Sequence, residues 1–439
     1  MVKPAQDSSE LITLTRWEKV KVILTAAFGE FANYFDFFAA AYVSAVVWPI
    51  IFFSSKTPII AVLVSIAAYG LSYVARPVGA IVFGHIGDRR GRLSAMIWTL
   101  IVLGLGSIGI TVLPPYAAIG LAAPALLVLF RLLVGFGLGG EAGGGWTWAA
   151  EATADSKYWS FWAGLVQAIG IIGIAIPSFL FGYIELSIPR SAFISWGWRI
   201  PFAIGALVVV VGTIIRFKAS ESPVFKKILS KRRVEKVPVV TMIKEDLRTF
   251  LATLIPFTQN TAATGLVLVP FSLLYISKFG IPYALAGKVE GLATAAGGFI
   301  GALVASFLTI KFEKKHYLWL VGSLGAFVFL YPMFMLLRTA ELMYAALGWG
   351  IFYFFNEFMA GSYPSVATSY FSARFRVSAA NLAIGLGGAI SGILITIFVP
   401  MMRQNVFSGL NILLTVYIII EILVVISLLS IKKKGDITA

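Results

Sequence analysis

Long apolar runs recur along almost the whole chain, separated by short charged, proline or glycine breaks. Twelve such runs cover residues 20–53, 58–85, 93–113, 122–150, 158–185, 197–217, 249–277, 283–310, 317–337, 341–370, 375–401 and 406–431. A helix needs about 20 mostly apolar residues to cross a bilayer. The runs lack the alternation over about 10 residues that is typical of membrane β-barrels. The pattern predicts an all-α integral membrane protein with twelve transmembrane helices.

The composition agrees with a chain that lies in lipid. Hydrophobic residues make up 59% of the chain and charged residues 13%, whereas soluble domains carry about 25% charged residues. With no cysteine and two histidines, disulfides, thiolate metal sites and cysteine nucleophiles are excluded, and we expect no metal site and no catalytic residue. The first 18 residues are polar and lack a cleavage signature, so we expect no removable signal peptide.

The distribution of cations indicates the orientation. With the N-terminus placed in the cytoplasm, 26 of the 35 Lys and Arg residues fall on the inner side, ten of them between Arg216 and Arg248, and seven fall outside. The count includes Lys3, Lys56, Arg232, Arg233, Arg403 and Lys432 to Lys434. This bias predicts a cell-membrane protein with both termini cytoplasmic. The net charge of +15 is then a topology signal that suits anionic lipid headgroups, and we expect no nucleic-acid partner.

A polar stretch interrupts the apolar pattern at residues 218–248. It divides the chain into an N-terminal six-helix bundle at 1–217, a cytoplasmic linker with a short helix at 218–248, and a C-terminal six-helix bundle at 249–439. Two bundles around a central site are the usual plan of secondary transporters, in which rocking exposes the site to each side in turn.

The most specific string is RPVGAIVFGHIGDRRGR, from Arg76 to Arg92. It contains the pattern G-x-x-x-D-R-x-G-R, formed by Gly84, Asp88, Arg89, Gly91 and Arg92. This pattern resembles the signature loop of the major facilitator superfamily, and the preceding RPxG…FGH is similar to its metabolite:H+ symporter branch. The resemblance continues in RLLVGFGLGGEAGG, WGWRIPF and ESPVF. It implies the major facilitator fold, a functional monomer, and a conformational lock in which the loop residues pair with Glu151 and Glu221.

Charged residues at bilayer depth are costly and therefore mark candidate sites. Glu30, Asn33 and Asp36 are spaced by three, which puts them on one face of the first helix. The resemblance implies that Asp36 and Arg131 form a proton-coupling pair. Where the family has a glutamate this chain has Asn33, and Glu30 is the residue that would take its place. A static structural ion pair is the alternative for Asp36 and Arg131.

Arginine also marks the expected binding site. A guanidinium binds carboxylates in a planar, bidentate manner, and the resemblance implies that Arg76 contacts an anionic substrate. Arg199 is either a second anion contact or an interfacial anchor. Glu141 follows a glycine run and is expected either to contact substrate or to act in gating. The remaining substrate-binding candidates are Asn33, Tyr34, Gln167, Gln259, Asn260, Asn356 and Glu357.

These observations predict a proton-coupled symporter that imports a small organic anion, a carboxylate, by alternating access. Its partners are the small-molecule substrate, protons and membrane lipid. No nucleotide-binding loop is present, so we expect no cofactor, with H+ as the coupling ion. The alternatives are a symporter of a zwitterion such as betaine or proline, and an uncoupled facilitator or exporter. A non-transporting membrane sensor is a reading from a different class.

Overall fold

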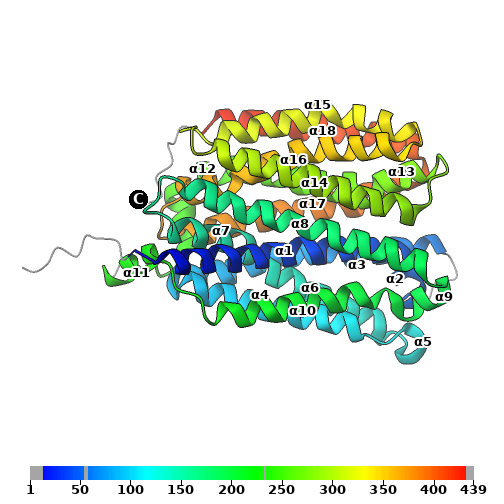
Figure 1. Cartoon of the computed structure of the whole chain (residues 1–439), viewed down its shortest axis with the longest axis horizontal. Coiled ribbons are helices and arrows are strands. Elements are labelled where there is room, and N and C mark those ends of the chain that lie inside the picture. The colour runs from blue at the N-terminus through cyan, green and yellow to red at the C-terminus, as the bar shows by residue number, and fades with distance from the viewer. Residues whose placement is uncertain (1–12, 54–57, 232–233, 432–439) are drawn as a thin grey trace, which may run out of the picture.

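The computed structural model describes residues 13–53, 58–231 and 234–431, and every regular element in those ranges is a helix. The elements are α1 (Arg16–Val46), α2 (Trp48–Ile51), α3 (Pro58–Arg89), α4 (Arg92–Val112), α5 (Tyr116–Ile119), α6 (Ala122–Leu138), α7 (Glu141–Ala152), α8 (Trp159–Ser187), α9 (Arg190–Ala192), η1 (Phe193–Gly197), α10 (Arg199–Arg216), α11 (Pro223–Ser230), α12 (Pro238–Ala262), η2 (Ala263–Ser272), α13 (Leu273–Ser277), α14 (Tyr283–Leu308), α15 (His316–Arg338), α16 (Leu342–Tyr370), α17 (Arg376–Gln404) and α18 (Val406–Leu429). The long helices run side by side along the long axis of the molecule (Figure 1).

The twelve apolar runs coincide with helices or with consecutive helices. Within the described residues, nine helical stretches are long and apolar enough to cross a membrane. The other three expected spans correspond to α1, to α12 continued by η2 and α13, and to α16. The expected all-α membrane fold is confirmed. The start of the seventh span differs most, because α12 begins at Pro238 and kinks at Asp246 (φ −140°) before the expected start at 249.

The first helix shows how the sequence defines an element. Thr15 and Glu18 form a capping box, in which the Thr15 backbone N–H donates to Glu18 (2.8 Å) and the Glu18 N–H donates to the Thr15 hydroxyl (3.3 Å). These bonds satisfy two of the four donors that a helix start leaves free. Further along, α1 packs mainly against α8 and also contacts α3, α7 and α10, which encloses its polar face.

Two helix pairs make the most extensive contacts between the part of the chain before α11 and the part after it. α8 packs against α14, and α3 packs against α17. Glycine permits such close packing: a Cβ added at Gly84 of α3 would lie 2.7 Å from the Cα of Ser378 in α17. On the outside, Ile419, Ile422 and Ile426 of α18 are about half exposed or more, as expected for a face that contacts lipid.

The two ends of the molecule differ. We call the end that carries residues 89–92, α11 and residues 371–376 the basic end; α5 and α9 lie at the opposite end (Figure 1). The basic end is the one predicted to face the cytoplasm, and this orientation stays a prediction. Several cations used in that argument lie outside the described residues, namely Lys3, Lys56, Arg232, Arg233 and Lys432 to Lys434.

Candidate functional site

A central cavity lies between helices from both parts of the chain. Its free volume is about 70 Å³, smaller than the roughly 300–1,000 Å³ that is usual for small-molecule sites. The cavity is lined by Asn33, Tyr34, Phe37, Tyr73, Arg76, Trp146, Gln167, Phe257, Asn260, Thr261, Thr264, Tyr363 and Ile384. Among these lining residues Arg76 is the single charged one. Five of the expected substrate-binding residues therefore meet here: Asn33, Tyr34, Arg76, Gln167 and Asn260.

Arg76 is held between α1 and α3. Its guanidinium donates a hydrogen bond to Asn33 Oδ1 (3.3 Å) and lies 4.7 Å from the centre of the Tyr73 ring. Asn33 in turn donates to Glu30 (3.5 Å). Glu30 is therefore connected to Arg76 by two hydrogen bonds through Asn33, behind the lining of the cavity. With 7% of its surface exposed, Arg76 presents a largely desolvated positive charge to the cavity.

A second carboxylate, Glu357, also lies behind the lining. The Tyr34 hydroxyl donates to Glu357 (3.3 Å), and the Gln167 amide donates to the Tyr34 oxygen (2.6 Å). Asn356 donates to Glu357 (3.1 Å), and Asn260 donates to the Asn356 carbonyl (3.1 Å). This network connects α1 and α8 to α16 and α12, so it bridges the two parts of the chain beside the cavity.

Asp36 and Arg131 form a buried ion pair with an N–O distance of 2.8 Å. Ser107 donates to the other Asp36 oxygen (3.3 Å), and Arg131 donates to Ser72 (2.9 Å). The exposed fractions of the two side chains are 7% for Asp36 and 1% for Arg131. The geometry thus joins α1 to α6 through two charges that are almost entirely withdrawn from solvent.

Two tyrosines of α3 connect this ion pair to the cavity. Arg131 lies over the Tyr69 ring (5.7 Å), the hydroxyls of Tyr69 and Tyr73 are 3.2 Å apart, and Tyr73 lies beneath Arg76. The two rings also meet edge to face. Two contacting aromatic side chains therefore lie between Arg131 and Arg76, so a displacement of Arg131 would shift the ring against which Arg76 packs.

Glu141 does not line the cavity. It forms a buried ion pair with Arg216 and accepts a hydrogen bond from Thr99 (2.5 Å). Arg216 also donates to the carbonyl of Met96 and to that of Thr25. The position of Arg216 after the sixth apolar run predicts a cation of the linker, but the Arg216 side chain is fully buried, because it ends α10 inside the bundle beside Glu141.

Arg199, Gln259 and Asn356 also lie away from the cavity lining. Arg199 donates to the carbonyls of Thr111 (3.1 Å) and Leu113 (2.9 Å) and lies over the Trp198 ring. These contacts lie toward the opposite end of the molecule and fit the anchoring alternative. Gln259 and Asn356 are fully buried, and Asn356 contacts two lining residues: it donates to the Thr264 hydroxyl (3.4 Å), and its carbonyl accepts from Asn260 (3.1 Å).

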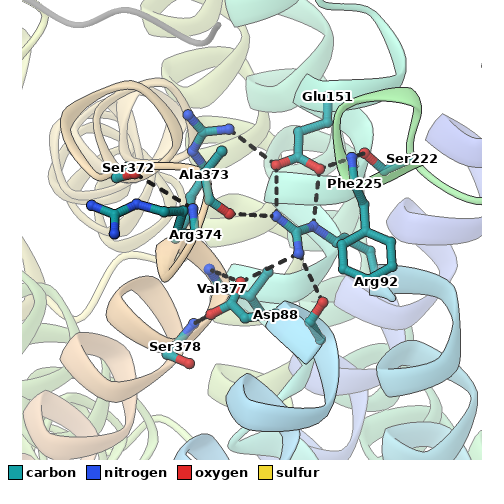
Figure 2. Close-up of polar contacts among 12 residues, drawn as sticks. Asp88, Arg92, Glu151, Ser222, Phe225, Ser372, Ala373, Arg374, Val377 and Ser378 are labelled. Carbon is teal, nitrogen blue, oxygen red and sulfur yellow. Dashed lines mark hydrogen bonds and ion pairs between the residues drawn. The ribbon is translucent and has the colours of Figure 1, made fainter. Parts of the chain in front are cut away.

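A network of ion pairs joins the two parts of the chain at the basic end (Figure 2). Arg92 donates to both oxygens of Glu151 (2.9 and 3.0 Å) and to the carbonyl of Ala373 (2.9 Å). Arg376 donates to Glu151 (3.0 Å), and the Ser222 hydroxyl donates to it as well (2.5 Å). Glu151 is therefore the shared partner of two fully buried arginines that belong to opposite parts of the chain, and Arg92 is also paired with Asp88 (3.3 Å).

Asp88 adds a different kind of contact between the two parts of the chain at the basic end. Its two oxygens accept the backbone N–H groups of Val377 (3.2 Å) and Ser378 (2.8 Å) at the start of α17. Helix N-termini carry free N–H donors and favour a negative charge. Asp88 of α3 thus caps a helix in the other part of the chain.

Glu221 and Arg89 occupy the edge of this network. Glu221 accepts the backbone N–H groups of Arg92 (3.0 Å) and Leu93 (3.2 Å), and burial raises the pKa of its carboxyl above the usual value. Arg89 is exposed and contacts His85 at 3.3 Å. The structure therefore brings Asp88, Arg92, Glu151 and Glu221 together and leaves the Arg89 side chain at the surface.

Gly91 is the turn on which this arrangement depends. Its φ of 116° suits glycine, and a Cβ there would lie 2.2 Å from a Glu221 oxygen. We expect Gly91→Ala to lower the free energy of unfolding by more than the roughly 1–3 kcal/mol of backbone strain that a side chain incurs at this positive φ, as measured by thermal unfolding in detergent. Gly120→Ala is the matched control, with φ of 58° and nothing within 4 Å. An equal loss in both variants would contradict a role for the Glu221 contact.

Several buried polar residues were missed by the sequence argument. Glu290 accepts from Ser272 (2.5 Å), and Glu421 accepts from Ser323 (2.6 Å). Both carboxylates interrupt apolar runs. The same signal identified Glu357, so it could have identified Glu290 and Glu421 as well. Asn381, which contacts Gly144 and Gly140 across the interface, carries no such signal. Among the described residues no group of three His, Asp or Glu side chains is placed to hold a metal ion.

Comparison with known proteins decides the class of the chain. The model of the family described as "Sugar (and other) transporter" matches residues 22–245, which is half of the sequence. The chain belongs to this transporter family of the major facilitator superfamily. It is therefore a multi-pass membrane transporter and not an enzyme, and the resemblance of its loop motif to that superfamily is confirmed.

Two relatives of the chain support the same class. The inner membrane metabolite transport protein YhjE of Escherichia coli (strain K12) is 34% identical over 273 residues, which cover 62% of this chain and 60% of that protein. A putative proline/betaine transporter of Staphylococcus haemolyticus (strain JCSC1435) is 30% identical over 377 residues, covering 84% of this chain and 79% of that protein. These names agree with the metabolite symporter branch that the motifs indicate.

A solved structure shares the fold. The proton:xylose symporter XylE, bound to 6-bromo-6-deoxy-D-glucose, superposes with a TM-score of 0.75 over 95% of both chains. The sequence identity in that comparison is 15%. The likeness therefore confirms the major facilitator fold of this family member and carries no information about its substrate.

Proposed function

We propose that this transporter is a proton-coupled symporter that imports a small organic anion, a carboxylate, by alternating access. The observation that carries the proposal is the connection between two sites. Arg76 is the single charged residue that lines the cavity, and the Tyr69–Tyr73 pair links it to the buried Asp36–Arg131 ion pair. A substrate site and a titratable pair in contact are what coupled transport requires.

Arg76 supplies the anion site. Its guanidinium is largely buried and contacts Asn33 with one nitrogen, and guanidinium groups bind carboxylates through paired, charge-assisted hydrogen bonds. Gln167, Asn260 and Tyr34 line the same cavity and would orient the rest of the molecule. No further cation lines the described cavity, so a single carboxylate matches its charge.

Asp36 supplies the proton site. When ionised it neutralises Arg131, and protonation would leave the Arg131 charge uncompensated in a low-dielectric interior. Arg131 would then rearrange, and the Tyr69 and Tyr73 rings, which meet edge to face, would transmit that change to Arg76. Glu30, which reaches Arg76 through Asn33, is the second carboxylate proposed to take part in coupling.

The basic-end network supplies the gate. Gly84, Asp88, Gly91, Arg92, Glu151 and Glu221 hold α3, α4 and α7 against α17. With these contacts formed the basic end is closed, and breaking them would open it. We propose that the parts at 1–217 and 249–439 rock against each other in this way, joined by the linker at 218–248, and that the protein works as a monomer with both termini cytoplasmic.

A zwitterion such as betaine or proline is the second candidate. Six aromatic residues line the cavity, namely Tyr34, Phe37, Tyr73, Trp146, Phe257 and Tyr363. Aromatic faces attract cations, and Glu357 lies one hydrogen bond behind Tyr34. The relative named as a putative proline/betaine transporter favours the same candidate. Both candidate substrates present a carboxylate to Arg76, and they differ in the rest of the substrate molecule.

Replacing Arg76 by alanine should abolish carboxylate binding. Loss of one partner from a buried charge pair costs about 2–5 kcal/mol, so affinity should fall by at least about 30-fold. Purified protein in proteoliposomes, given an inward proton gradient, is screened against labelled mono- and dicarboxylates and betaines. Arg190→Ala, at an exposed arginine 3.8 Å from Glu185, is the control. Unchanged affinity in Arg76→Ala would remove Arg76 from the site, and a wild-type protein that accumulates no carboxylate would contradict the proposed function.

A further inference from the structure

Three side chains of the cavity keep polar atoms without a hydrogen-bond partner. They are Nε of Arg76, the indole Nε1 of Trp146 and Oε1 of Gln167. The exposed fractions of these residues are 7%, 3% and 2%, so bulk water does not satisfy them. Buried polar groups are normally paired. The three unpaired groups around this cavity therefore indicate which hydrogen-bonding groups a ligand must carry to pair with them.

The roles of the three atoms follow from their chemistry. Arg76 Nε and the Trp146 indole N–H can only donate. The Gln167 amide is oriented by its neighbours: its nitrogen donates to the Tyr34 oxygen (2.6 Å), because the Tyr34 proton is directed to Glu357 (3.3 Å). The atom left over on Gln167 is thus an acceptor. The cavity offers two unused donors and one unused acceptor.

Trp146 is fixed in place by the opposite part of the chain. Its ring stacks on Phe257 of α12, with centroids 6.2 Å apart and planes within 13°. Phe257 in turn packs against Tyr363 of α16, with ring centroids 4.4 Å apart. Because α7 carries Trp146 and α12 and α16 carry the other rings, the indole is held between both parts of the chain.

We propose that the cavity selects a carboxylate that also carries a hydrogen-bond donor, a hydroxyl or an N–H. The carboxylate oxygens accept from Arg76 and Trp146, and the donor of the ligand binds Gln167 Oε1. A carboxylate without such a donor, or one whose nitrogen is fully methylated, leaves the Gln167 oxygen unpaired. This inference rests on the proposed function and narrows its substrate class, since it favours hydroxy acids and amino or imino acids over betaines.

Equilibrium binding tests the inference without a proton gradient. The purified full-length protein in lipid nanodiscs is titrated by calorimetry with matched pairs: 3-hydroxybutyrate with butyrate, shikimate with cyclohexene carboxylate, and L-proline with N,N-dimethyl-L-proline. In each pair that binds, we expect the member with the donor to bind at least about tenfold more tightly. Equal affinities within the pairs would overturn this inference and leave carboxylate transport standing. Binding of no carboxylate at all would overturn both.

Two variants assign the preference to its atoms. Gln167→Met should reduce the difference within a pair to less than about twofold by weakening only the member with the donor. Trp146→Phe, which removes the N–H and keeps the ring, should weaken both members by the same factor of about ten. Trp319→Phe is the matched control, because its indole N–H is also buried and unpartnered but does not line the cavity. A full preference retained in Gln167→Met would overturn the role of Gln167.

Discussion

Asp36→Asn should abolish accumulation of substrate up an imposed proton gradient while retaining exchange of substrate at equal pH. Asparagine cannot be ionised, so the cycle of pairing with and releasing Arg131 is lost, although the cavity residues are unchanged. Proteoliposomes measure both activities in one preparation: uptake driven by an inward proton gradient, and counterflow without one. We expect gradient-driven accumulation to fall to the level seen without a gradient.

A structural role for the same pair predicts a different result. Removing one partner of a buried ion pair destabilises a protein by about 3–5 kcal/mol, so Asp36→Asn should also lower stability. In the double variant Asp36→Asn with Arg131→Gln no buried charge remains unpaired, and stability should recover while accumulation does not. Recovery of accumulation in the double variant, or undiminished accumulation in Asp36→Asn alone, would leave the pair as a static ion pair. Asp155→Asn, in a partly exposed pair with Lys19, is the control.

Glu151→Gln should open the basic end. Glu151 is the shared partner of Arg92 and Arg376, and its neutralisation leaves two buried arginines without that partner, which penalises the closed arrangement by several kcal/mol. The chain has no cysteine, so a single Ala380→Cys can report on this change. Ala380 is fully buried where α17 faces Gly143. We expect its labelling by a water-soluble maleimide to accelerate at least tenfold in the Glu151→Gln background.

The matched control lies at the same end of the molecule. Glu235 is paired with Arg374 at 2.5 Å, but both side chains are partly exposed, and such pairs contribute about 0–1 kcal/mol. Glu235→Gln should therefore leave the labelling rate within about twofold of the parent. If Glu151→Gln labelled no faster than Glu235→Gln, the network around Glu151 would not be what holds this end closed.

The helices could be predicted because each had to satisfy its backbone within lipid. Apolar length alone placed them, and the loop motif indicated the superfamily. The breaks inside spans were not predictable in the same way. α6 ends before Gly139 and α7 begins at Glu141, where a Cβ at Gly139 would lie 2.2 Å from the Arg76 carbonyl. Such a break depends on which helix packs against that position, and the hydropathy of the sequence gives no information about the neighbouring helix.

The residues of the candidate site could likewise be predicted only in part. Charges at bilayer depth identified Asp36, Arg76 and Arg131, because each would be costly in lipid without a partner. The burial of Arg216 could not be predicted in this way, since a cation at the end of a span has the same local sequence whether it faces water or turns inward to Glu141. The Arg376–Glu151 bond joins residues 225 positions apart, a distance over which spacing along one helix gives no information.

The contact between Asp88 and α17 has a consequence for which positions can vary. Asp88 is bound by main-chain N–H groups, so the side chains of Val377 and Ser378 take no part in those bonds. Replacing either residue by any other than proline, which lacks a backbone N–H, would leave the donors in place, whereas an insertion or deletion that shifts the start of α17 by one residue would turn them away. The half of the transporter that carries Asp88 is thus constrained in residue identity, and the half that receives it is constrained in register.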